Sequence, residues 1–162
     1  LQAHLEKDPL MDGSIPDILV DNDDMSAVIV DGKWKRLTSE MELGYIGNYG
    51  PSMLMADTGN ERVNQVIFMP PIPETGHYKI YSYFVKTAKT SGKTNITVHD
   101  GQTTKSIIIN KADIAIEGQT SGEWVYLGKF LLPKGRSSTV IITDKGADGN
   151  IVADAVLMVH QK

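Results

Sequence analysis

Aromatic residues on predicted loops are the first candidates for chemistry in this sequence. Trp34 is flanked by charge in DGKWKRL, and Tyr45 and Tyr49 occur in the glycine-rich stretch ELGYIGNYGPS. Flat aromatic rings bind sugars by stacking on the apolar face of a pyranose, while nearby polar groups bind its hydroxyls. Because loops often carry binding residues, we predict all three as ligand-binding. The alternative is that each ring anchors its loop to the core.

A second aromatic pair lies in the strand-like run HYKIYSYFV. Period-two alternation puts Tyr78, Ile80 and Phe84 on one face, which we assign to the core. Tyr81 and Tyr83 share the other face and are predicted to be exposed ligand-binding residues. The alternative is that they pack beneath another sheet or an N-terminal helix.

Four carboxylates are candidate ligands for a structural calcium ion. Asp21 belongs to the DNDD cluster, Asp144 and Asp148 belong to DKGADGN, and Asp154 follows shortly after. Oxygen ligands at alternate positions before a glycine are typical of calcium loops. The pattern departs from that loop because Gly146 occupies the third position and no glutamate closes the set. Ordinary turns with side-chain caps on backbone amides are the alternative.

Asp154 interrupts IVADAVLMV, which is otherwise entirely apolar. A buried carboxylate without a partner costs several kcal/mol, roughly. We therefore expect Asp154 either to accept hydrogen bonds in a structural role or to share a calcium ion with Asp21.

Catalytic templates are absent from the sequence. It contains no cysteine, no H-E-x-x-H and no G-x-S-x-G, and its four histidines are far apart. The 20 acidic residues could include a glycosidase pair, but nothing selects one. We predict that this chain is not an enzyme and has no cofactor apart from the possible calcium.

The overall composition excludes some partners. A formal charge of −4 with scattered basic residues does not predict nucleic-acid binding. No apolar run is long enough for a membrane span. The chain starts at Leu1, so we expect any targeting signal to lie upstream.

Short strand-like runs separated by turn-formers fill most of the chain. Asp100-Gly101 between two alternating runs predicts a hairpin. Long helical periods, which parallel sheets need for their crossovers, are missing. The pattern predicts an all-β protein, an antiparallel β-sandwich or jelly roll. The predicted strands are 18–22, 52–57, 62–69, 77–85, 94–99, 104–110, 123–132, 137–144 and 150–159.

The run EWVYLGKFLL is apolar on both faces. It is therefore either covered on two sides or bulged at Gly128, and in either case we expect Trp124 to point into a core. Residues 1–16 differ from the rest and predict a short helix and linker, which either pack on this domain or form the end of a preceding one. Residues 17–162 form the predicted sandwich module.

Six motifs in order resemble the golvesin/xanthan-lyase carbohydrate-binding-like domain. They are V-D-N at 20–22, G-x-W at 32–34, G-x-Y-x-I-Y at 76–81, T-V-H-D-G at 97–101, W-x-x-L-G-x-F at 124–130 and V-A-D-A-V at 152–156. The resemblance implies a galactose-binding-like sandwich attached to a larger bacterial enzyme. LQAHLEKDPLMDG also resembles the closing helix of an FAD-dependent oxidoreductase domain.

The resemblance implies a non-catalytic accessory module that binds a polysaccharide or other glycan. Its parent would be an FAD-dependent oxidoreductase or a polysaccharide lyase, located outside the cell or in the periplasm. The alternative is a structural or interdomain module that contacts the preceding domain of the same polypeptide, or another protein, and binds no sugar.

Overall fold

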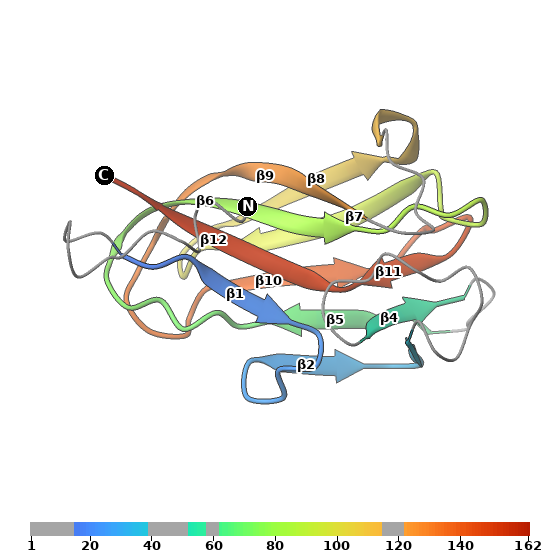
Figure 1. Ribbon diagram of the computed structural model, residues 1–162, viewed down its shortest axis with the longest axis horizontal. Helices are drawn as coiled ribbons and strands as arrows, with labels where there is room; N and C mark the ends of the chain where they lie inside the picture. The colour runs from blue at the N-terminus through green and yellow to red at the C-terminus, as the bar shows by residue number, and fades with distance from the viewer. Residues whose placement is uncertain (1–14, 39–51, 58–61, 115–121) are drawn as a thin grey trace.

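The computed structural model describes residues 15–38, 52–57, 62–114 and 122–162. Twelve β-strands and one short 3₁₀ turn make up the regular structure of these ranges (Figure 1). No helix within them has the length and apolar character to cross a membrane. The short helix predicted within residues 1–16 falls outside the described ranges, as do Tyr45 and Tyr49. The strands are β1 (Ile18–Asp21), β2 (Val28–Asp31), β3 (Lys35–Leu37), β4 (Met53–Ala56), β5 (Gln65–Phe68), β6 (Gly76–Phe84), β7 (Lys93–His99), β8 (Thr104–Asn110), β9 (Glu123–Leu132), β10 (Thr139–Thr143), β11 (Ile151–Ala153) and β12 (Ala155–Gln161), and η1 is Lys111–Asp113.

Antiparallel strands form two main sheets, so the predicted β-sandwich is confirmed. A four-stranded sheet has the order β1-β12-β6-β9, and a five-stranded sheet has the order β2-β5-β10-β7-β8. A small third sheet, β11-β4-β3, extends one end. The predicted strand at 150–159 is divided at Asp154, because β11 and β12 belong to different sheets. Strands β2 and β3 were not predicted.

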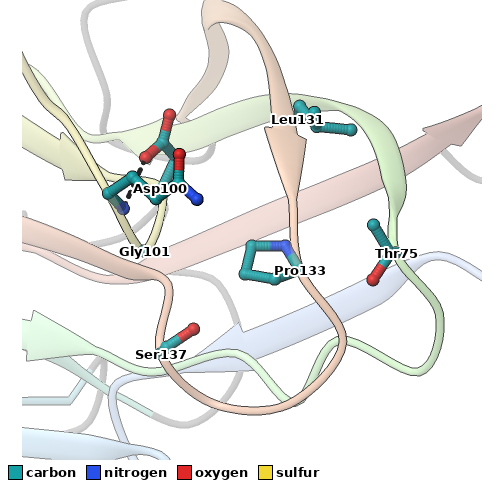
Figure 2. A pocket seen from close by; sticks show the side chains of 7 residues that line it. Thr75, Asp100, Gly101, Leu131, Pro133 and Ser137 are labelled. Carbon is teal, nitrogen blue, oxygen red and sulfur yellow. Dashed lines mark hydrogen bonds between the residues drawn. The ribbon is translucent and has the colours of Figure 1, made fainter.

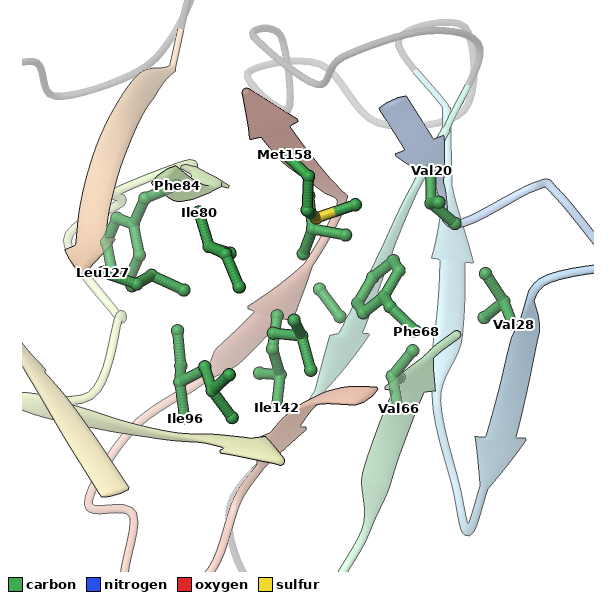
Figure 3. Close-up of a cluster of buried hydrophobic side chains, with 14 of the residues drawn as sticks. Val20, Val28, Val66, Phe68, Ile80, Phe84, Ile96, Leu127, Ile142 and Met158 are labelled. Atoms are coloured by element: carbon green, nitrogen blue, oxygen red, sulfur yellow. The ribbon is translucent and has the colours of Figure 1, made fainter. Parts of the chain in front are cut away.

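The core lies between the two main sheets (Figure 3). Strand alternation supplies it: Ile80 and Met158 project from the four-stranded sheet toward Phe68 and Ile142 of the five-stranded sheet. All four side chains are at most 1% exposed. Burial on this scale contributes roughly 1.5–3 kcal/mol for each large apolar side chain. The core thus fixes which residues of every strand face outward.

The predicted hairpin at Asp100-Gly101 is confirmed as the turn between β7 and β8. Gly101 has a φ of +102°, which a residue with a side chain rarely adopts. The Asp100 carboxylate accepts the backbone amides of Gln102 and Thr103 at 2.9 and 2.8 Å. These hydrogen bonds lower the pKa of Asp100 and fix the turn at one end of the sandwich.

A bulge at Gly128 changes the register of β9. Ile80 pairs with Gly128, but the next residue, Tyr81, pairs with Tyr126, so Leu127 is extra. Consequently Trp124 lies opposite Tyr83 on the outer face of the four-stranded sheet. The expectation that Trp124 points into the core is wrong, because the bulge puts Leu127 there instead.

Candidate ligand sites on the sandwich

Trp34 forms one wall of a shallow cleft at the end of β2. The cleft has a volume of about 310 Å³ and is lined by Gly32, Lys33, Trp34, Lys35, Met55 and Asp57. The indole is half-buried against the main core, and its Nε1 donates to the Asp31 carbonyl at 3.1 Å. Trp34 therefore anchors its loop and also presents part of its ring to the cleft, so loop anchoring and ligand binding do not exclude each other.

The loop carrying Trp34 is held in place by Asn64, which is buried. Asn64 Oδ1 accepts the Lys33 backbone amide at 2.7 Å. Gly32 has a φ of +96°, and a Cβ there would overlap the Asn64 carboxamide. Position 32 therefore needs a glycine, both for its backbone conformation and for the lack of space beside Asn64. Nothing in the local sequence around Asn64 predicts this role, because the role depends on a contact between distant segments.

Charged groups surround the exposed rim of the Trp34 cleft. Lys35 Nζ lies 2.8 Å from Asp57, and both side chains are exposed. Lys33 is also exposed. The cleft thus combines a half-buried aromatic wall with donors and acceptors, which are the groups that bind hydroxylated ligands.

Tyr81 and Tyr83 lie on the outer face of the four-stranded sheet, as their alternation predicted. The Tyr83 ring packs edgewise on Trp124, with centroids 5.1 Å apart and planes at 67°. Its hydroxyl accepts the Gly122 amide at 2.7 Å, and the ring contacts a second apolar cluster. The Tyr81 ring lies 5.4 Å from that of Tyr126, which is 52% exposed. Tyr83 is therefore largely engaged within the protein, whereas Tyr81 and Tyr126 offer an accessible ring pair.

The four predicted calcium ligands are not brought to one place. Asp144 accepts from Asn64 twice, and Asp148 accepts the Ser91 hydroxyl at 2.9 Å and the Gly92 amide at 2.8 Å. The Gly92 hydrogen bond is the main reason that the pKa of Asp148 is lowered. Both carboxylates hold loops together. Within the described ranges no three His, Cys, Asp or Glu residues are grouped to hold a metal ion.

Asp21 and Asp154 do lie together, at the end of β1. Burial is the main cause that raises the pKa of Asp21 to about 6, and its hydrogen bond with the Asp154 carboxyl offsets part of this rise. Two carboxyl groups can share a hydrogen bond only if one carries a proton. Asp154 is fully buried within the apolar run that it interrupts. Calcium binding by this pair stays a prediction.

A polar cluster beside Asp21 ties β1 to the small sheet. Arg36 contacts Asp23 with two nitrogens at 2.9 and 3.2 Å, and this contact lowers the pKa of Asp23. Ser52 Oγ also donates to Asp23 at 2.8 Å. The carboxylates of the DNDD stretch therefore have structural partners.

A second hollow, which sequence reasoning missed, lies at the opposite end of the sandwich. It has a volume of about 440 Å³ and is lined by Thr75, Asp100, Gly101, Gln102, Leu131, Pro133 and Ser137 (Figure 2). Three loops meet here, and the Lys134 amide donates to Thr75 Oγ1 at 2.9 Å. Leu131 is 54% exposed and gives this hollow an apolar wall.

The fold defines a class of protein: a two-sheet antiparallel sandwich like those of carbohydrate-binding modules. A family 35 carbohydrate-binding module from Clostridium thermocellum has a TM-score of 0.56 at 14% identity, and the match covers 91% of this chain and 100% of that one. At this identity the likeness concerns the fold alone. The chain belongs to the Golvesin C-terminal domain family, whose model matches residues 18–160.

Xanthan lyases contain a similar region. The xanthan lyase of Bacillus sp. (strain GL1) is 28% identical over 149 residues, covering 90% of this chain and 15% of the lyase. The structure of Paenibacillus xanthan lyase matches with a TM-score of 0.77 and 22% identity, covering 90% of this chain and 13% of the lyase. The chain thus spans about 15% of the length of the curated relative that it matches.

Proposed function

We propose that this chain is a non-catalytic accessory module that binds carbohydrate at the Trp34 cleft. The observation that carries the proposal is the placement of a half-buried indole beside Lys33 and the Lys35–Asp57 ion pair, on a loop fixed by Asn64. A fixed loop loses little conformational entropy on binding. The sugar ring would lie against the indole, and its hydroxyls would bind the lysine and aspartate groups.

The family and the similar structures support the same proposal. The relatives place a domain of this fold in a much longer lyase chain, and the similar fold from Clostridium thermocellum is a carbohydrate-binding module. Of the two parents expected from the sequence, the relative supports a polysaccharide lyase, and the FAD-dependent oxidoreductase stays a prediction. We infer an extracellular or periplasmic location, because polysaccharide ligands are found there.

Native gels containing single polysaccharides test the proposal. Xanthan and a panel of neutral and acidic polymers would be compared by the retardation of the wild-type chain, Trp34→Ala and Lys33→Ala. We expect at least one polymer to retard the wild type and both substitutions to weaken this effect. Lys33 is exposed, so its variant is expected to fold even if Trp34→Ala does not. Full retention of binding by both folded variants would refute the cleft as the site.

A structural or interdomain role is the second candidate, and the edge strand β2 favours it. Ile29 and Val30 on this edge are 48% and 42% exposed, and Met25 nearby is 78% exposed. Apolar side chains on an open edge strand promote pairing with other chains. A neighbouring domain that covers β2 would remove this exposure. Ile29→Lys would then destabilise the parent protein but leave the isolated module unchanged.

A further inference from the structure

Two lysines lie directly opposite each other on the outer face of the four-stranded sheet. Lys79 on β6 pairs with Lys129 on β9 in the strand register. Lys129 is exposed and Lys79 is half-buried, and the ion pairs among the described residues involve neither. Like charges directly opposite one another destabilise a sheet. An anionic ligand on this face would supply the missing counter-charge.

The neighbouring row of the same face is aromatic. Tyr81 and Tyr126 are the next outward-facing pair along β6 and β9, and their ring centroids are 5.4 Å apart. Tyr126 is 52% exposed, so part of its side chain is accessible to a ligand. Basic and aromatic groups therefore lie about two strand residues apart, roughly 7 Å.

The bulge at Gly128 creates this arrangement. In a regular strand, Tyr126 and Lys129 would project to opposite faces because they are three residues apart. The extra residue in β9 puts both on the outer face, opposite Tyr81 and Lys79. Gly128 has a φ of +140°, so the bulge depends on a conformation that favours glycine.

The face continues into the hollow at the end of the sandwich. Leu131 is the outward residue after Lys129 on β9, and it also lines the hollow formed with Asp100 and Pro133. We call this run of Tyr81, Tyr126, Lys79, Lys129 and Leu131 the β6–β9 strip. Along β6 the strip covers the five residues from His77, which pairs with Leu131, to Tyr81, a span of about 14 Å at about 3.4 Å per residue. This length suits an extended polymer better than a single sugar.

We propose that the β6–β9 strip is a second binding surface and that its ligand is an acidic polysaccharide. Lys79 and Lys129 bind a carboxylate of the polymer, Tyr126 stacks on a neighbouring sugar ring, and the chain runs past Leu131 toward the hollow. This inference rests on the proposed carbohydrate-binding function, but it names a different site and the charge of the ligand. Two lysines on a chain of net charge −4 form too small a basic surface for nucleic acid.

Affinity electrophoresis with charge-matched polymers tests the strip. The gels would contain polygalacturonate or alginate, each paired with its carboxyl-reduced form, and single-stranded DNA would serve as an unrelated polyanion. The variants are the double Lys79→Gln/Lys129→Gln and the single Tyr126→Ala. The control Lys89→Gln/Lys145→Gln makes the same change in net charge on exposed loop residues. Thermal unfolding would establish that each variant is folded.

We expect an acidic polymer to retard the wild type and its carboxyl-reduced form to retard it less. The lysine double variant should bind about fivefold more weakly, as two exposed ion pairs would give, while the control Lys89→Gln/Lys145→Gln keeps its binding to the acidic polymer. Equal binding of both polymer forms, equal loss in the control, or equal binding of DNA would overturn the proposal. Binding of neutral glycans lost only in Trp34→Ala would reject the strip but keep the proposed function. If no polymer retards the wild type, both the strip and the proposed carbohydrate-binding function are rejected.

Discussion

Asp144 accepts two hydrogen bonds from Asn64, one from its backbone amide and one from its side-chain amide, each 2.7 Å long. Asn64 in turn accepts the Lys33 amide, so a carboxylate after β10 determines the position of the Trp34 loop. A residue considered as a calcium ligand is thus a support for the candidate sugar site.

Replacing Asp144 tests this support. Asp144→Ala leaves the buried Asn64 donors unsatisfied and should lower the free energy of unfolding by about 2 kcal/mol. Asp144→Asn keeps one acceptor and should lose less. Urea unfolding gives both values, and glycan affinity should fall in the same order. Equal stability of the two variants would contradict the role assigned to Asp144.

The raised pKa of Asp21 predicts a pH dependence. A carboxyl whose pKa rises from 3.8 to about 6 on folding binds its proton more tightly in the native state. Its stabilising contribution is complete below pH 3.8 and is lost as the pH rises through about 6. Asp21→Asn removes that loss. The free energy of unfolding of the variant, relative to wild type, should therefore rise by on the order of 1 kcal/mol between pH 4.5 and 7.5.

Addition of calcium tests the other role predicted for Asp21 and Asp154, as ligands of a metal ion. If Asp21 and Asp154 act only as structural hydrogen-bonding groups, millimolar calcium chloride should leave the unfolding midpoint of the wild type unchanged near neutral pH. A rise in the wild-type midpoint that Asp21→Asn abolishes would instead establish the calcium site predicted from the sequence. Asp148→Asn serves as a control, because Asp148 binds Ser91 and Gly92 elsewhere.

Gly128 should tolerate substitution poorly. A Cβ there would lie 3.1 Å from Phe130 Cε1 in a backbone conformation with a φ of +140°. We expect Gly128→Ala to cost about 1–3 kcal/mol. Gly135→Ala is the matched control, because its φ is +112° but nothing lies within 4 Å. A smaller loss at Gly135 separates the steric contact from backbone strain; equal losses would show that the contact with Phe130 adds nothing.

Much of the fold followed from period-two alternation, but features set by distant contacts did not. The alternation in β6 assigned Tyr78 and Ile80 to the core correctly, and the turn residues at Asp100-Gly101 located a hairpin. The short edge strand β2 was missed. The bulge at Gly128, one of the two options predicted for β9, is confirmed, but Trp124 was assigned to the wrong face.

The candidate site was predictable to a smaller extent. Trp34 was singled out by its loop context, and the structure adds a cleft beside it. Asn64 and the lysine pair Lys79–Lys129 carried no local signal, because each acquires its role only when strands far apart in the sequence are placed in register. Tyr45 and Tyr49 lie outside the described residues and stay predictions.

Chemical-shift mapping tests the central claim most directly. An isotope-labelled chain would be titrated with an oligosaccharide from a polymer that retards it in native gels. We predict chemical-shift changes of the backbone amides of Gly32 to Lys35 and of Asp57, and of the Trp34 indole N–H. No new products should form in the mixture. Shifts confined to other surfaces, or the appearance of cleaved sugar, would contradict a non-catalytic module that binds carbohydrate at the Trp34 cleft.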